Sequence, residues 1–344
     1  MNLIELHILQ SFPVTCLNRD DVGSPKTATF GGTPRARLSS QSLKRAVRTT
    51  ARDIAGEKAF GGIRSRFLLK PFTEAFASRG LEPDEAEQKA KSVCETFSKV
   101  DKKNDDQVTT AVYLSPSEIE QIAEAVVAGD DPKKAAKKVQ RLDAADISLF
   151  GRMVANDATL NVEGAAMFSH ALSTHKSANE IDFFSAVDDR KDDAEDAGAG
   201  MIGTLEYNSA TYYRYAAVNL DLLSDSSHLE ALSSDERREI LRAFLRATLV
   251  AVPGARKNSM NGATLPGAVL GIRKSQGHPL QLVNAFETPV AANGGGLLAK
   301  SEEVLRQHHD RLKSIWGVET DVEVWLDEDT PIDSFLDQLL AANV

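Results

Sequence analysis

The sequence predicts an α+β fold in which a ferredoxin-like βαββαβ core carries a large helical insertion. Near the start of the chain, the apolar residues Ile4, Leu6 and Ile8 alternate with polar residues, the pattern of a strand. Residues 58–164 show mainly helical periodicity, and strand-like segments return after residue 211. Strand–helix–insertion–strand–strand–helix–strand is the order of a ferredoxin-like unit, which is also the scaffold of RNA-recognition modules.

Length and composition restrict the class of protein. The chain has 344 residues and 42% hydrophobic content, enough for a sizeable core. Its two cysteines, Cys16 and Cys94, are far apart and lack C-x-x-C spacing, so we expect no disulfide, metal or cofactor. The first 15 residues lack the pattern of a signal peptide, and no apolar stretch approaches the ~20 residues of a membrane span. We therefore expect a soluble cytoplasmic protein without a membrane partner.

Charge is distributed unevenly along the chain. The formal net charge is −10, which by itself argues against a nucleic-acid partner. Residues 1–52, however, hold eight Lys or Arg and three acids, a local charge of +5, whereas residues 317–344 hold eight acids and no Lys or Arg. Because salt screens distant charges, a local basic face can still bind a polyanion.

The first predicted strand covers residues 3–10, and a loop of about 27 residues follows at 11–37. Loops of that length are usually functional or disordered. The strand is predicted to be buried on one face only, because its residues alternate: Ile4, Leu6 and Ile8 against Glu5, His7 and Gln10.

A helix is predicted to begin at residues 39–41, Ser-Ser-Gln. Lys44, Arg48 and Arg52 recur every four residues, with Arg45 beside them. They lie on a flank separate from the apolar stripe, which consists of Leu43, Val47, Thr50, Ala51 and Ile54. A helix N-terminus with hydroxyl donors and nearby cations suits a phosphate and needs no particular base. An ordinary N-cap with a solvated basic face remains the alternative on spacing alone.

Two further helices are predicted in the insertion. One begins at the capping box of residues 115–118, and the other at Asp131-Pro132. The second carries a basic stripe that is either a solvated face or a nucleic-acid contact: Lys133, Lys134, Lys137, Lys138 and Arg141. Ala135, Ala136, Val139 and Leu142 form its other side.

The remaining chain alternates between strands and helices. Residues 180–206 are acidic and poor in apolar residues, which predicts an exposed excursion. Strands are predicted at 212–222, 269–272 and 322–326. Helices are predicted from the capping box at residues 233–236 to Pro253, at 300–316 and at 331–343.

Several motifs resemble the CasC family, the RNA-binding backbone subunit of the type I-E CRISPR Cascade complex. The most specific are CLNRDD at residues 16–21, FGG at 30–32 and RARLSSQSLKRA at 35–46. Others are SLFGRM at 148–153, HALSTH at 170–175, DFFSAVDD at 182–189, YRYA at 213–216 with NL at 219–220, VPGA at 252–255 and NAFE at 284–287. The resemblance spans residues 1 to about 290, with little identity between 58 and 145.

The resemblance implies a hand-shaped subunit with an RRM-like palm, helical fingers and a protruding thumb hairpin or loop. The implied palm is 1–57, 165–176 and 212–344, the fingers are 58–164, and the thumb is 177–211. Copies would form a helical filament along the spacer of a guide RNA (crRNA), each thumb kinking the strand while the bases stay free to pair with target DNA. The implied partners are guide RNA, target DNA, further copies and subunits of the CasA, CasB, CasD and CasE types. No catalysis is implied.

The resemblance also implies which residues contact nucleic acid. Thr33-Pro34 departs from the family's commoner, more basic pattern. The implied RNA contacts are Asn18, Arg19, Lys26, Arg35, Arg37, Ser39, Ser40, Gln41, Lys44, Arg45 and Arg48. Met153, Ser185 and Ile202 are placed beside the kinked base, with plain packing as the alternative. The stripe of Lys133, Lys134, Lys137 and Lys138 is placed on the target duplex.

Two other functions compete with this interpretation. Asp20 and Asp21 could hold a divalent cation beside RNA and cleave a paired target RNA, as a loop aspartate does in related RNA-targeting complexes. The segment at residues 39–45 is typical of the DNA-targeting branch, so we expect no cleavage. A filament-forming protein without nucleic acid is the third possibility, and it would purify without RNA.

Overall fold

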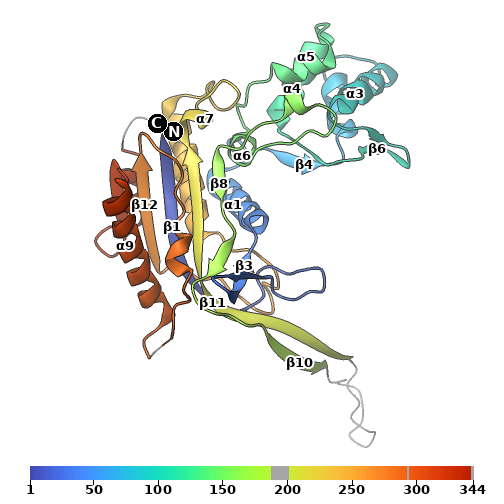
Figure 1. Ribbon diagram of the computed structural model, residues 1–344. Helices are drawn as coiled ribbons and strands as arrows, with labels where there is room; N and C mark the ends of the chain where they lie inside the picture. Colours follow the sequence, from blue (N-terminus) through green and yellow to red (C-terminus); the bar gives the residue numbers. More distant parts are fainter. Residues whose placement is uncertain (187–200, 293, 342–344) are drawn as a thin grey trace, which may run out of the picture.

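A computed structural model of the chain describes residues 1–186, 201–292 and 294–341. Within them a nine-stranded antiparallel sheet has the order β13-β12-β1-β11-β9-β3-β2, and β8 and β10 also pair with β11 (Figure 1). The strands are β1 (Leu3–Thr15), β2 (Thr27–Phe30), β3 (Thr33–Leu38), β8 (Ala166–Phe168), β9 (Ala171–Ser173), β10 (Glu180–Ala186), β11 (Met201–Asn219), β12 (Ala268–Lys274) and β13 (Val322–Leu326). The mixed α+β fold with a large sheet confirms the predicted class.

Helices cover both faces of this sheet. The helices α1 (Ser40–Ala55), α8 (Ser234–Val250) and α10 (Ile332–Leu339) pack on one face, where Ile4, Leu6 and Ile8 join their core. The helix α9 (Leu297–Trp316) covers the other face, with Leu9 and Leu305 in a second core (Figure 1). Short α7 (Leu220–Leu223) and the 3-10 turn η2 (Val283–Phe286) connect elements. The predicted capping box at Ser233 is confirmed, and the C-terminal helix is shorter than predicted.

The prediction that β1 is buried on one face only is wrong. Glu5 and His7 are fully or almost fully buried because α9 and its flanking segments cover the second face. Gln10 is also buried, but on the same face as Ile8, where its Oε1 accepts a hydrogen bond from Arg214. The carboxylate of Glu5 pairs with the Lys274 ammonium and accepts a hydrogen bond of 2.7 Å from Tyr215 Oη. These partners compensate the burial of the charge. The alternation of residues along β1 shows which side chains are polar, but it does not show that another element covers them.

The predicted long loop at residues 11–37 contains regular structure. The strand β1 continues to Thr15, and β2 and β3 form a hairpin. Gly31 and Gly32 form its two-residue turn, with φ of 57° and 72°. Two positive φ angles are those of a type I′ turn, which matches the twist of paired strands and strongly favours glycine. Of the predicted loop, only residues 16–26, between β1 and β2, and the two turn glycines lie outside strands.

Residues 63–160 form a helical insertion with a core of its own. Buried Phe72, Phe76 and Phe97 belong to this core. Two small sheets, β4 with β7 and β5 with β6, were not predicted. The elements are β4 (Ile63–Ser65), α2 (Leu69–Ala77), α3 (Pro83–Phe97), β5 (Val100–Asp101), β6 (Asn104–Val108), β7 (Val112–Leu114), α4 (Pro116–Val127), α5 (Pro132–Lys137), α6 (Ala145–Phe150) and η1 (Ala158–Leu160). The predicted segment boundaries stay predictions.

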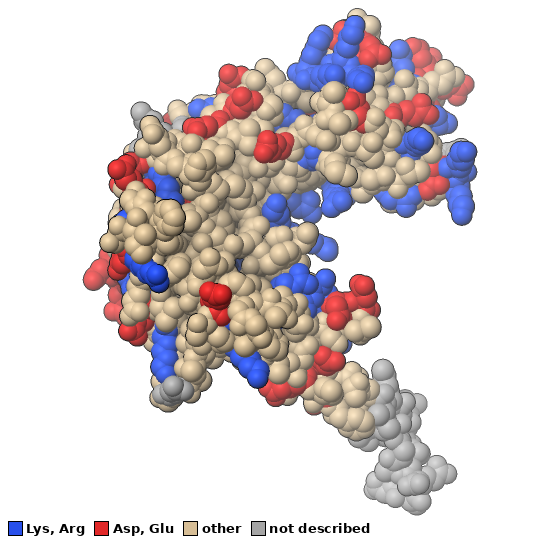
Figure 2. All heavy atoms as spheres, in the orientation of Figure 1, with Lys and Arg blue, Asp and Glu red and all other residues tan. Residues whose placement is uncertain are grey.

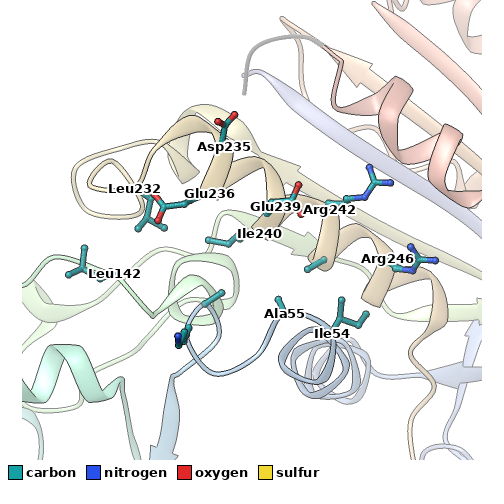
Figure 3. A pocket seen from close by; sticks show the side chains of 13 residues that line it. Ile54, Ala55, Leu142, Leu232, Asp235, Glu236, Glu239, Ile240, Arg242 and Arg246 are labelled. Carbon is teal, nitrogen blue, oxygen red and sulfur yellow. The ribbon is translucent and has the colours of Figure 1, made fainter.

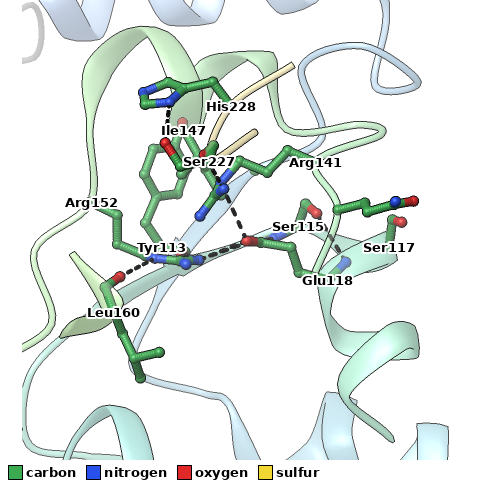
Figure 4. Close-up of polar contacts among 12 residues, drawn as sticks. Tyr113, Ser115, Ser117, Glu118, Arg141, Ile147, Arg152, Leu160, Ser227 and His228 are labelled. Carbon is green, nitrogen blue, oxygen red and sulfur yellow. Dashed lines mark hydrogen bonds and ion pairs between the residues drawn. The ribbon is translucent and has the colours of Figure 1, made fainter. Parts of the chain in front are cut away.

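A buried ion cluster joins the insertion to the rest of the molecule (Figure 4). Glu118 closes the predicted capping box with Ser115, and its carboxylate lies 2.9 Å from Arg152 Nη1. Arg141 Nε lies 3.8 Å from the same carboxylate, and its guanidinium donates to the carbonyl of Ser227 in the loop after α7. Arg141 is therefore buried, and its predicted place on the basic stripe is wrong because α5 ends at Lys137.

The predicted exposed excursion begins as a hairpin. β10 pairs with the first part of β11 from Glu180↔Tyr207 to Ala186↔Met201. The hairpin extends away from the sheet, and its tip lies outside the described residues (Figure 1). Ile181 and Phe183 are 69% and 64% exposed, which is unusual for large apolar side chains. In the described part of the chain, no helix is long and apolar enough to cross a membrane.

Candidate nucleic-acid interface

Two side chains organise the N-terminus of α1. Ser39 is its N-cap, and its Oγ accepts a hydrogen bond of 3.2 Å from Ser42 N. Ser40 N donates to Nδ1 of His170 at 3.0 Å. The N–H of Gln41 has no hydrogen-bond partner among the described residues, and the Gln41 side chain is exposed. The prediction of a free helix N-terminus therefore holds for one amide rather than for the whole first turn.

The basic flank of α1 lacks acidic partners. Lys44, Arg45 and Arg48 form no ion pair within 4 Å among the described residues. Lys44 Nζ lies 5.9 Å from the Phe168 ring, and the Arg48 guanidinium lies 5.2 Å from the Tyr113 ring. Burial lowers the pKa of Lys44 because a half-buried ammonium loses hydration. An arriving anion would supply the interaction that the protein does not give these cations.

The fourth basic residue of the flank has a different role. Arg52 Nε donates to the carbonyl of Phe60 at 2.7 Å, and its guanidinium lies 3.7 Å from buried Asp146. These contacts tie the end of α1 to the start of the insertion. Arg52 is therefore a structural residue, and the part of the flank without an ion pair among the described residues ends at Arg48.

The structure brings four of the predicted RNA contacts together. Asn18 Oδ1 accepts from Ser39 N at 2.9 Å, which fixes residues 16–26 against the N-terminus of α1. The carbonyl of Asn18 accepts from Lys26 N, and the carbonyl of Lys26 accepts from Arg37 N, each at 2.9 Å. The side chains of Lys26 and Arg37 are partly exposed and Arg19 is exposed, and none forms an ion pair in the described part of the chain.

Arg35 is the exception among these residues. It is 0% exposed, and its guanidinium donates to the carbonyls of Ser173 at 2.9 Å and Phe286 at 2.9 Å. A third bond of 3.1 Å reaches the carbonyl of Glu287. The protein itself thus supplies acceptors for this guanidinium, and the predicted RNA contact of Arg35 stays a prediction. Its side chain fixes the β2–β3 hairpin to β9 and to the end of η2 because buried backbone carbonyls need donors.

Lys and Arg side chains line a hollow of the molecule. In Figure 2 a concave side lies between the helical insertion and the region of β3 and the β10–β11 hairpin. Blue atoms gather along its wall over α1, whereas red atoms gather on the outer side near α9. This arrangement agrees with the charge asymmetry of the sequence, and it gives a polyanion one favourable face.

The HALSTH motif supports this site in a way that sequence analysis missed. Besides His170 at the first turn of α1, Ser173 Oγ accepts from Ala36 N at 3.1 Å and donates to the carbonyl of His175. His175 Nε2 in turn accepts from Thr211 N at 3.2 Å. The two histidines are five residues apart in the sequence. They act separately, on the helix and on β11.

Of the three residues predicted beside the kinked base, Met153 lies apart from the other two in one chain. Met153 follows α6 and is 79% exposed, while the preceding Arg152 is buried in the ion cluster. Ser185 is exposed on β10 and is the register partner of Ile202, whose side chain lies outside the described residues. In Figure 1 the end of α6 and the β10–β11 hairpin lie on different sides of the hollow. Met153 and the hairpin of one chain therefore form no single site.

The four lysines predicted on target DNA differ in how free they are. All four are exposed on or next to α5. Lys133 Nζ lies 2.7 Å from Asp157, and Lys138 Nζ lies 2.9 Å from Asp130. Lys134 and Lys137 form no ion pair among the described residues. Their charge is thus the part of the stripe that is available to a partner.

The loop aspartates are arranged differently from a metal site. Asp20 Oδ1 accepts from Val22 N at 3.0 Å and Ser24 N at 2.9 Å, so this carboxylate orders the turn that follows it. Asp21 is exposed. Across the residues that the structure describes, no group of three or more His, Cys, Asp or Glu could hold a metal ion.

A hollow of about 580 Å³ lies at the other end of α1 (Figure 3). It is formed by Ile54 and Ala55 of α1 and by one side of α8, with Glu239, Arg242 and Arg246 at its rim. Ile54 belonged to the predicted apolar stripe but is 44% exposed. None of the predicted RNA contacts lines this hollow, so it is separate from the basic flank.

Comparisons with known proteins agree with this geometry. A family model described as CT1975-like protein matches residues 4–342. No curated protein matches the chain. A solved chain titled "CRISPR RNA-guided surveillance complex, pre-nicking" is 28% identical, with a TM-score of 0.79 over 99% of this chain and 100% of that chain. Another, titled "CRISPR RNA-guided surveillance complex", is 25% identical, with a TM-score of 0.64 over 98% of each chain. The predicted resemblance to the CasC family is confirmed, and the chain belongs to the CT1975-like protein family.

Proposed function

We propose that the chain is a non-catalytic, RNA-binding backbone subunit of a type I-E CRISPR surveillance complex in the cytoplasm. Copies assemble along the spacer of a guide RNA and hold its phosphates without sequence preference. The bases remain available for pairing with target DNA. The observation that carries the proposal is the flank of Lys44, Arg45 and Arg48. Among the described residues, these three cations have no acidic partner and lie beside the backbone N–H of Gln41, which has no hydrogen-bond partner there.

The predicted core supports this proposal. The strands β12, β1, β11 and β8 are neighbours in that order, with α1 and α8 on one face. This order is consistent with a ferredoxin-like βαββαβ unit, in which α1 would join the first two strands and α8 the last two. On this proposal, the insertion and the hairpin would serve as fingers and thumb.

The separation of Met153 from Ser185 supports assembly into a filament. Within one chain the end of α6, which Met153 follows, lies away from the β10–β11 hairpin, which carries Ser185 (Figure 1). A kink site formed from both therefore requires the hairpin of one copy to reach the insertion of another. CasA, CasB, CasD and CasE types of subunit would complete the complex.

Guide retention tests the proposal. We would co-express the tagged chain with a guide RNA and its partners, purify the assembly and measure RNA per protein. In Lys44→Glu with Arg48→Glu, two attractive contacts become repulsive, so we expect at least a roughly tenfold loss of RNA per protein. Thermal unfolding of the isolated chain checks that the variant folds.

The matched control is Lys134→Glu with Lys137→Glu, which makes the same change in charge on the insertion. We expect this variant to retain guide RNA because α5 is assigned to target DNA. Equal RNA content in both variants and the wild type would refute the role of α1. Loss in both would show that the binding reflects total charge rather than the flank.

Cleavage of paired target RNA is the alternative function, and the contacts of Asp20 weigh against it. A carboxylate that accepts two backbone hydrogen bonds has fewer lone pairs left for a cation. The discriminating assay incubates the assembled complex with complementary RNA and Mg²⁺. We expect no products, and cleavage that is lost in Asp21→Ala would support a nuclease.

A further inference from the structure

The loop of residues 253–265, which follows α8, lies against the segment that positions the N-terminus of α1. Thr264 Oγ1 donates to the carbonyl of Ser11 at 2.9 Å, and Gln10 Nε2 donates to the carbonyl of Thr264 at 2.7 Å. A Cβ on Gly262 would lie 2.6 Å from Thr15 Cγ2 and 3.0 Å from Leu17 Cδ2. The loop is thus packed closely against the residues just before Asn18.

The charged part of this loop has an unusual conformation. Arg256 has φ of 51°, the only positive φ of a non-glycine residue in the described part of the chain. Its carbonyl accepts from Ser259 N at 3.2 Å and Met260 N at 2.8 Å, which closes a turn around Lys257. Left-handed backbone is unfavourable for arginine, and such conformations concentrate at functional sites.

The two basic side chains of the turn have no ion pair or side-chain hydrogen bond among the described residues. Arg256 Nε is buried without a hydrogen-bond partner, and the guanidinium forms no ion pair among the described residues. Lys257 is exposed, forms no ion pair in the same part of the chain, and lines a hollow of about 350 Å³ together with Leu17. A buried donor without an acceptor costs free energy unless a ligand satisfies it.

The position of the turn extends the basic surface already described. Arg256 and Arg19 both act electrostatically on the thiol of Cys16, so both guanidinium groups lie near this residue. That segment continues through Leu17 to Asn18, which holds the N-terminus of α1. The loop is therefore next to the segment that holds the N-terminus of α1.

We propose that Arg256 and Lys257 form a second phosphate-binding element for the guide RNA, next to the flank of α1. This inference rests on the proposed function. Arg256 and Lys257 would contact phosphate oxygens, because unpaired cations on a packed turn offer charge and donors without reading a base edge. The element would bind guide RNA rather than target DNA because it adjoins Arg19 and Asn18 rather than α5.

The test measures how RNA binding depends on salt. Assemblies of the wild type, Arg256→Gly, Lys257→Ala and the double variant would be incubated with a labelled guide across a salt series. Each phosphate contact on single-stranded RNA contributes about 0.7 to the log–log slope. We expect each single variant to lower the slope by about 0.7 and the double variant by about 1.4. Glycine at residue 256 keeps the left-handed backbone accessible, so this variant removes the guanidinium without straining the turn.

The control is Arg311→Ala on α9, an exposed residue on the opposite face of the sheet. We expect its slope to equal that of the wild type. A wild type that binds guide while the loop variants keep its slope would overturn the loop assignment and leave the role of α1 intact. If the loop variants changed the salt slope for target DNA and not for guide RNA, the loop assignment would also be overturned. Failure of the wild type to bind guide would refute both assignments.

Discussion

Gly31 and Arg35 bring two motifs that are far apart in the sequence into contact. The FGG motif forms the turn between β2 and β3, and the NAFE motif supplies the carbonyls that Arg35 binds. A Cβ on Gly31 would lie 1.8 Å from the carbonyl oxygen of Glu287. The hairpin therefore rests directly on backbone, which leaves no room for a side chain.

Gly31→Ala is expected to destabilise the fold more than Gly32→Ala does. Both residues have positive φ, so each alanine costs about 1–2 kcal/mol for its conformation. Only Gly31 adds a clash, because nothing lies within 4 Å of a Cβ on Gly32. Denaturant unfolding of both variants measures the difference, and equal free energies of unfolding would contradict the close approach.

His7 is expected to make the protein less stable in acid. Burial, followed by the charges of His309 and Lys274, lowers its pKa from 6.5 to about 3. Between these values the unfolded chain binds more protons, so the free energy of unfolding is retained above about pH 6.5 and falls as pH decreases towards 3. One such group contributes up to about 1.4 kcal/mol per pH unit.

The measurement is denaturant unfolding at several pH values between 7 and 4. We expect His7→Gln to show a shallower loss of stability with falling pH than the wild type. The control His278→Gln, at an exposed position, should follow the wild type. Identical pH dependence in the His7→Gln variant would show that another group dominates.

At the scale of elements, α1 was predicted well because its signals are local. The cap at Ser39 and the buried residues Leu43, Val47 and Ala51 follow from spacing along one helix. The insertion's capping box at Ser115 was predicted for the same reason. Signals of this kind need only four to eight neighbouring residues.

The features that the sequence did not predict depend on residues that are far away along the chain. Sequence showed Arg35 as one more cation, and only the carbonyls at residues 173, 286 and 287 make it structural. The alternation predicted that Glu5 and His7 face solvent, but α9 covers them in the structure. The β2–β3 hairpin carried a signal that could have been used, since adjacent glycines between β-prone residues favour a type I′ turn.

The lysines of α5 are expected to contribute unequally to target binding. We expect Lys134→Gln with Lys137→Gln to lower the log–log salt slope for duplex DNA by up to about 1.8, at about 0.9 per phosphate contact. Lys133→Gln with Lys138→Gln should change it less, because Asp157 and Asp130 already hold these charges. The measurement is the binding of a duplex DNA of unrelated sequence to the guide-loaded complex across a salt series. A larger effect of Lys133→Gln with Lys138→Gln than of Lys134→Gln with Lys137→Gln would contradict the assignment of Lys134 and Lys137 to target DNA.

At the scale of the whole molecule, the shape and the charge distribution act together. The hollow faces the basic flank, whereas the acidic residues gather on the outer side near α9 (Figure 2). A polyanion is attracted to one side and repelled from the other. Repeated along a filament, many weak contacts of this kind would combine into tight binding without any base being read.

The most direct test of the central claim compares guides that share no spacer sequence. Complexes would be assembled on three guides with unrelated spacers, and RNA retention would be measured across a salt series. We predict the same retention for all three, a steep salt dependence, and loss in Lys44→Glu with Arg48→Glu. Retention of one spacer over the others, or retention that ignores salt, would contradict a backbone-gripping subunit.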